Sequence, residues 1–299
     1  MDTIEAMVAE RPRAMNPEEW KVRVDLAACY RLIAHFGWDD MILGHISARV
    51  PGSNRHFLIN PMGLMFPEIT ASSLLKLDLD GNLVEPSDYE PNYAGFVIHS
   101  AVYMTREDAG CVLHTHTEAD IAVGALEEGL LPLSQWAMPF YGNTGYHDYE
   151  GVSLDLDERA RLQGDLGEHQ VLVLRNHGLL TVGRDPAEAF WLTYHFERSA
   201  EAQLKIQAAA AAGGKIVTPP REVCEASSRA SRTGRHPAHD GPSRMARPAA
   251  SGGEARSELP ELSLNPPAPL IAAVTSRTGG QPRCRAAAAP LPLSPGWAA

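Results

Sequence analysis

The chain has 299 residues, 44% of them apolar, and a formal net charge of −11. This length and apolar content suffice to bury a core, which excludes a fibrous or wholly disordered protein. Residues 1–225 hold 33 acidic against 17 basic side chains, a balance that argues against a nucleic-acid partner. No long apolar run follows a basic segment near the start, so we expect a cytoplasmic protein with no membrane partner. The four cysteines are widely spaced and are expected to be reduced thiols.

The first third of the sequence predicts one helix and two hairpins. Asn16 can cap a helix that begins at Pro17, and apolar residues then recur at helical spacing to about residue 36. Residues 45–50 and 56–61 are short β-type runs separated by turn residues. Residues 74–85 repeat this pattern around Asp-Gly-Asn, which predicts a second hairpin.

The middle of the sequence alternates helical and β-type segments. Residues 92–105 and 118–129 have helical character, and a β-type run at 111–116 separates them. A buried strand, a tight turn and another strand are expected over 169–183. A long helix capped by Asp185 is expected over 186–212. The pattern predicts an α/β fold in which helices cover both sides of a mixed sheet.

Composition divides the chain into three parts. We expect a flexible N-terminus over 1–15 and a single domain over 16–225. Residues 226–299 contain no Lys, Phe or Tyr but 11 of the 23 prolines, which predicts a low-complexity, disordered tail. A shifted reading frame of a GC-rich gene would also produce this excess of Arg, Ala, Pro, Gly and Ser.

Three histidines are the candidate metal ligands. His114 and His116 lie two residues apart on a predicted strand, so their imidazoles project from the same face. His177 follows Asn176 at the turn between two predicted strands, where side chains gather at the end of a sheet. Three neutral imidazoles with an open position for water or substrate form a catalytic zinc site.

These motifs resemble the class II aldolase/adducin family. The resemblance rests on the HTH at 114–116, the NHGLL beginning at 176, and a GxxSxR pattern formed by Gly44, Ser47 and Arg49, over about 200 residues. It implies a three-layer α/β/α sandwich with a mixed, largely antiparallel sheet. It also implies a divalent metal, most often Zn2+ but also Mn2+ or a similar ion, held by the three histidines. A small-molecule substrate and a homo-oligomer, often a tetramer, are implied as well.

The sequence departs from the family pattern where the aldolases bind phosphate and carry an acid/base carboxylate. Tyr93, Ala94 and Gly95 stand at those positions, so the carboxylate and both hydroxyls are absent. The usual Asn after Gly44 is His45, and the usual hydroxyl residue before Gly63 is Met62. Gly44, His45 and Gly63 remain the expected substrate-binding residues.

Two functions are compatible with these departures. The first is a metal-dependent lyase that cleaves or decarboxylates a small hydroxycarbonyl or carboxylate substrate through an enolate, with His45, His147 or Glu118 as acid/base. The second is a non-catalytic adducin-like binding module with a structural or vestigial metal site. His99, predicted on an apolar helix, is expected to support the site rather than react.

Overall fold

The structure is a computed structural model that describes residues 12–151 and 156–232. Most of the predicted N-terminal segment and residues 233–299 of the predicted tail lie outside the described residues. Helix α7 (Arg221–Arg232) crosses residue 225, where the sequence predicted the domain to end. Its Ser228 is 2% exposed and donates to the carbonyl oxygen of Tyr141 at 2.8 Å. Residues 226–232 therefore belong to the folded part of the chain.

The centre of the fold is a seven-stranded mixed sheet in the order β3-β2-β1-β4-β7-β6-β5. All neighbouring pairs are antiparallel except β5 and β6, which are parallel. The predicted mixed, largely antiparallel sheet is thus confirmed. The strands are β1 His45–Arg49, β2 His56–Ile59, β3 Leu75–Asp78, β4 Cys111–Thr115, β5 Thr144–His147, β6 Val171–Leu174 and β7 Gly178–Gly183.

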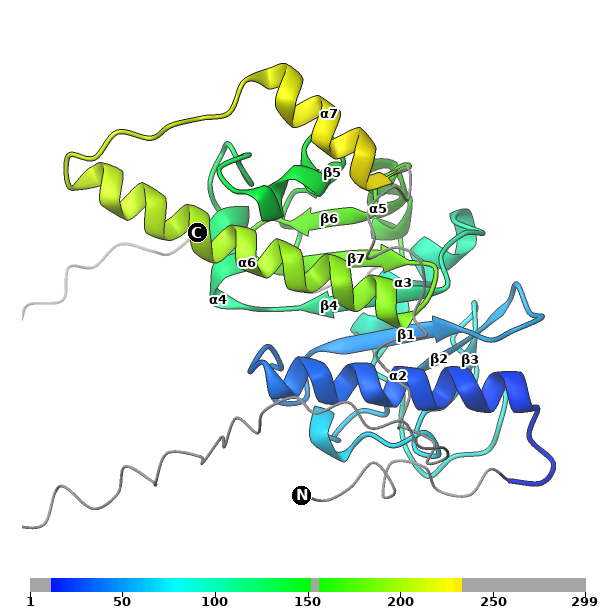
Figure 1. Cartoon of the computed structure of the whole chain (residues 1–299). Helices are drawn as coiled ribbons and strands as arrows, with labels where there is room; N and C mark the ends of the chain where they lie inside the picture. The colour runs from blue at the N-terminus through cyan, green and yellow to red at the C-terminus, as the bar shows by residue number, and fades with distance from the viewer. Residues whose placement is uncertain (1–11, 152–155, 233–299) are drawn as a thin grey trace, which may run out of the picture. The chain divides into compact units, whose positions relative to one another are not determined.

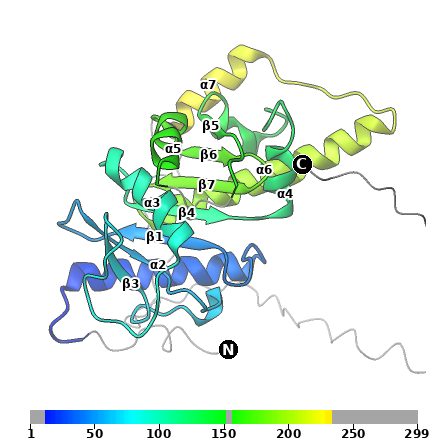
Figure 2. The same cartoon turned by 180° about the vertical axis from the view of Figure 1, so that it is seen from behind.

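Helices cover both faces of this sheet and complete the predicted three layers. Helices α2 and α6 lie along one face (Figure 1), whereas α3 and α5 cover the other, which Figure 2 shows from behind. Short helices connect several strands. The helical bounds are α2 Pro17–His35, η1 Phe66–Glu68, α3 Tyr93–Thr105, α4 Glu118–Gly124, η2 Gln135–Phe140, α5 Glu158–Leu166 and α6 Pro186–Ala211.

Side chains that alternate between the two faces of the sheet form one hydrophobic core on each face. In β4, Val112 packs with Phe96 of α3 and Leu162 of α5, whereas its neighbour Leu113 packs with Leu26 of α2. Successive strand residues point to opposite faces, so each strand needs apolar side chains on both. This explains why β4 and β6 read as continuous apolar runs. Among the described residues, no helix is both long and apolar enough to span a membrane.

Two predicted elements are shorter in the structure. The second hairpin is reduced to β3 and an isolated bridge between Leu77 and Leu83, because the Asp78 carboxylate accepts from the backbone N–H groups of Asp80 and Asn82 and closes the turn locally. Helix α4 stops at Gly124, where a Cβ would lie 3.0 Å from Val173 of β6. The sequence analysis did not anticipate β5, α5 or α7.

Candidate metal centre

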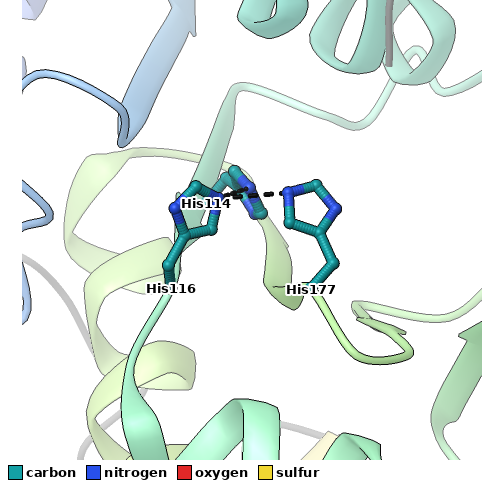
Figure 3. A group of neighbouring side chains, drawn as sticks. All are labelled: His114, His116 and His177. Carbon is teal, nitrogen blue, oxygen red and sulfur yellow. Dashed lines mark hydrogen bonds between the residues drawn. The ribbon is translucent and has the colours of Figure 1, made fainter. Parts of the chain in front are cut away.

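The three predicted metal ligands meet at the ends of β4 and β7. His114 lies in β4, His116 follows it, and His177 occupies the turn between β6 and β7. The His116 Nε2 atom lies 2.7 Å from Nε2 of His114 and 3.1 Å from Nε2 of His177, so all three rings point inward (Figure 3). The three ligand atoms lie within 4.8 Å of one another. One ion can therefore contact all three nitrogens.

The turn that carries His177 depends on its two neighbours. Asn176 has a φ of 58°, a left-handed conformation that Asn tolerates better than most residues. A Cβ on Gly178 would lie 2.2 Å from the carbonyl oxygen of Thr115, so only glycine lets this turn approach the end of β4. The Asn-His-Gly sequence thus brings His177 beside the two histidines of β4.

Hydrogen bonds orient two of the rings. His114 Nδ1 lies 2.8 Å from the carbonyl oxygen of Leu179, to which it donates, and His116 Nδ1 lies 3.0 Å from Oδ2 of Asp40. Such partners fix the tautomer and leave the Nε2 lone pair free for a metal. The contact between Asp40 and His116 was not predicted from the sequence. The two residues are 76 positions apart and meet only in the folded chain.

The donor set fits a divalent cation. Burial lowers the pKa of His114 well below its ordinary value and that of His177 to about 4, so both are neutral near pH 7. A His116 ring that carries a proton on both nitrogens still has only one proton on Nε2. That proton can be donated to Nε2 of His114 or to Nε2 of His177, but not to both. Unprotonated nitrogens at these distances repel unless a cation lies between them. The residues therefore fit a three-histidine zinc-type site.

Behind the metal centre, His45 and His99 belong to a buried polar cluster. His45 is 2% exposed, and its ring centroid lies 4.7 Å from that of His114. Its Nδ1 lies 2.8 Å from Nε2 of His99, whose Nδ1 lies 2.5 Å from Oγ of Ser47. Burial lowers the pKa of His99 to about 3, so this ring is neutral. His99 contacts His45 in this cluster, and its supporting role stays a prediction.

The predicted substrate-binding glycines have different surroundings. Gly44 is buried, and a Cβ there would lie 2.8 Å from Cζ of Phe66, so glycine is required for this packing immediately before His45. Gly63 is exposed at a turn with a φ of 92°. Gly44 thus helps to place His45, whereas the conformation of Gly63 is a property of its turn.

His147, an acid/base candidate from the sequence, ends strand β5 and is 4% exposed. Its Nδ1 lies 2.7 Å from Oδ2 of Asp165, and its Nε2 lies 3.5 Å from Oε1 of Glu158. His147 and Glu158 line a pocket that also includes His177. Both carboxylates come from α5, which the sequence analysis missed, so neither was recognised in advance. Glu118, by contrast, is exposed at the start of α4.

Comparison with known proteins agrees with this architecture. Residues 24–204 match the family model of the class II aldolase and adducin N-terminal domain. A crystal structure of an aldolase II superfamily protein from Pseudomonas syringae is 49% identical, with a TM-score of 0.69 over 77% of this chain and 89% of that chain. The chain belongs to the class II aldolase and adducin family.

The relatives include both enzymes and adducins. The L-fuculose 1-phosphate aldolase of Glaciozyma antarctica is 26% identical, with a TM-score of 0.64 over 76% of this chain and 88% of that chain. Mouse alpha-adducin is 43% identical over 207 residues, which are 68% of this chain but 28% of the adducin. Family membership alone therefore does not separate the two functions.

Proposed function

We propose that the chain is a metal-dependent carbon–carbon lyase that cleaves or decarboxylates a small hydroxycarbonyl or carboxylate substrate. The observation that carries the proposal is the convergence of three Nε2 atoms that hydrogen bonds cannot satisfy. A bound divalent ion, with Zn2+ as first choice and Mn2+ as the alternative, would supply Lewis-acid stabilisation of an enolate. His114, His116 and His177 would hold it.

His147 is our choice for the acid/base residue. Asp165 accepts from its Nδ1, which holds the ring in one orientation and turns Nε2 toward Glu158 and the pocket. A carboxylate that orients an imidazole in this way is how histidine is positioned to transfer protons. Asp165 would act as a positioning residue. The exposed Glu118 lines no part of this pocket.

The charges around the pocket favour a substrate without a phosphate group. Asp148, Glu150 and Glu158 are among the lining residues. Arg175 also lines it, but its guanidinium donates to the carbonyl oxygens of Gly124 and Leu126 and is committed to the fold. A phosphate dianion would meet mostly carboxylates there. This matches the loss of the phosphate-binding hydroxyls inferred from the sequence.

The second candidate is an adducin-like binding module. It is favoured by the similarity to alpha-adducin and by Gly95, which stands where the family's aldolases carry the acid/base carboxylate. In this case the histidines would hold a structural ion or none. We further propose, from the family resemblance alone, a cytoplasmic homo-oligomer, to be measured by light scattering.

Metal analysis of the full chain tests the proposal. We expect about one divalent ion per chain in the purified protein and its loss in the double variant His114→Ala/His116→Ala. His56→Ala, which removes a histidine of β2, is the matched control and should retain the ion. Bound metal would justify screening hydroxycarbonyl and carboxylate substrates for release of aldehyde or carbon dioxide. Absence of metal after loading with Zn2+ or Mn2+ would contradict the enzyme and favour the adducin-like module.

A further inference from the structure

Four buried polar side chains form a continuous row of hydrogen bonds behind the metal centre. The Tyr103 hydroxyl lies 2.9 Å from Oγ of Ser47, Ser47 Oγ lies 2.5 Å from Nδ1 of His99, and His99 Nε2 lies 2.8 Å from Nδ1 of His45. None of the four is more than 3% exposed. Buried polar groups of this kind must form hydrogen bonds with one another, because they cannot form them with water.

The direction of these hydrogen bonds follows from Tyr103, the residue at the end of the row opposite His45. The backbone N–H of Val112 can only donate to the Tyr103 hydroxyl, which leaves Ser47 Oγ as the acceptor for the phenol proton. A buried phenol that left its proton unused would lose about 1–3 kcal/mol, so Tyr103 donates to Ser47. The Ser47 hydroxyl then has His99 Nδ1 as its acceptor. That nitrogen is therefore unprotonated.

The same logic fixes the proton on His45. A neutral His99 whose Nδ1 accepts must carry its proton on Nε2, which donates to Nδ1 of His45. His45 Nδ1 is then an acceptor, and its proton lies on Nε2. Whereas the three candidate ligands present Nε2 lone pairs, His45 presents an N–H group. A metal cannot bind that nitrogen until the proton leaves.

The His45 ring lies beside the metal centre. His45 pairs with His114 across β1 and β4, and their ring centroids are 4.7 Å apart. Within the described part of the chain, its Nδ1 has a side-chain hydrogen-bond partner, His99, and its Nε2 has none. An oxygen atom bound at the metal centre would be the natural acceptor. Donors fixed in advance stabilise negative charge without the cost of reorganisation.

We propose that His45 is a fixed N–H donor that binds the oxygen anion of a carboxylate or enolate substrate, and is neither a fourth metal ligand nor a base. Tyr103, Ser47 and His99 are positioning residues that hold this tautomer. The inference rests on the proposed function for its substrate class, but the tautomer itself can be measured without any substrate. The site would therefore select molecules that place an anionic oxygen opposite His45.

Nitrogen-15 NMR of the histidine side chains in the full chain tests the tautomer directly. We expect a pyrrole-type signal at Nε2 of His45 and a pyridine-type signal at Nδ1, both without metal and with Zn2+. Ser47→Ala removes the donor to His99 and should let the opposite tautomer of His45 become populated. A proton on Nδ1 of wild-type His45, or loss of the Nε2 proton on adding Zn2+, would overturn the proposal.

Binding of acetohydroxamate, a small chelator with two adjacent oxygens, tests the role. In the zinc-loaded chain we expect His45→Ala to weaken binding by roughly tenfold or more, as for loss of a hydrogen bond to a charged group. Ser47→Ala, which keeps the imidazole, should weaken binding less, and His56→Ala not at all. Unchanged affinity in His45→Ala with normal zinc content would refute the role, whereas a chain without zinc would refute the proposed function instead.

Discussion

The side chain of His45 occupies the space that a residue larger than glycine would need at position 95. A Cβ on Gly95 would lie 2.9 Å from Cγ and 3.0 Å from Cδ2 of His45, closer than such atoms approach. Gly95 stands where the family's aldolases carry a carboxylate, and His45 where they carry Asn. The two positions that depart from the family pattern therefore lie in contact, with the His45 imidazole filling the space beside Gly95.

This relationship predicts that the effect of Gly95→Ala depends on His45. In the wild-type background the clash should destabilise the chain by about 1–3 kcal/mol, the usual cost of overpacking. In a His45→Ala background the same substitution should be neutral or stabilise by up to about 1 kcal/mol, because Ala favours the helix. Urea unfolding of the four chains measures this coupling. Equal effects in both backgrounds would show that the residues do not compete for space.

The contact between Asp40 and His116 predicts an effect on metal affinity. Asp40→Asn removes the carboxylate 3.0 Å from Nδ1 of His116, which orients the ring and fixes its tautomer. Loss of such a partner typically costs 10- to 100-fold in affinity, and we expect roughly that range here. Competition with a fluorescent zinc chelator measures it. The neighbouring Asp39→Asn is the control and should retain wild-type affinity; an equal loss in both would assign the effect to general charge.

The sequence predicted the architecture because its signals are local. Asn16 and Asp185 cap the helices that begin at Pro17 and Pro186, and the β-type runs at 45–49 and 111–115 place two of the strands. Strand β5 was missed because its four residues, Thr-Gly-Tyr-His, show no such pattern. Helix α7 was missed because it begins beside the change in composition near residue 225.

The geometry of the site was only partly predictable. His114 and His116 share a strand face, so their convergence follows from spacing alone. His177, Asp40 and Asp165 reach their partners only through sheet pairing and helix packing, which no local pattern encodes. The sequence showed the departures from the family pattern at His45 and Gly95 separately. Only the folded structure shows that the two residues are in contact.

A buried carboxyl pair predicts how stability changes with pH. Asp120 of α4 and Glu197 of α6 are each 1% exposed. Burial, followed by the neighbouring Glu197, raises the pKa of Asp120 well above its ordinary value, and burial also raises that of Glu197. The folded chain therefore binds a proton that the unfolded chain releases above about pH 4. This stabilisation is complete below that pH and is lost as pH rises through the raised pKa.

We expect Asp120→Asn to remove this dependence. Relative to wild type, the variant should gain up to about 1.4 kcal/mol in unfolding free energy for each pH unit above 4, until the raised pKa is passed. Urea unfolding at a series of pH values measures the difference between the two chains. Glu128→Gln, an exposed acid just beyond α4, is the control and should follow the wild-type curve. A constant difference between Asp120→Asn and wild type across this range would contradict the shared proton.

Helix α7 is expected to stabilise the folded domain. Cys224 and Ser228 of α7 are 1% and 2% exposed, and the helix packs on η2. A chain ending at residue 220 should unfold at a lower temperature than one ending at residue 232. Loss of the hydrogen bond from Ser228 to Tyr141 alone, in Ser228→Ala, should cost about 1 kcal/mol, or roughly 2–4 °C. Ser227→Ala, whose hydroxyl makes no such bond, is the matched control. If the chain ending at 220 unfolded at the same temperature as the chain ending at 232, α7 would contribute nothing to stability and the domain would end where the composition changes.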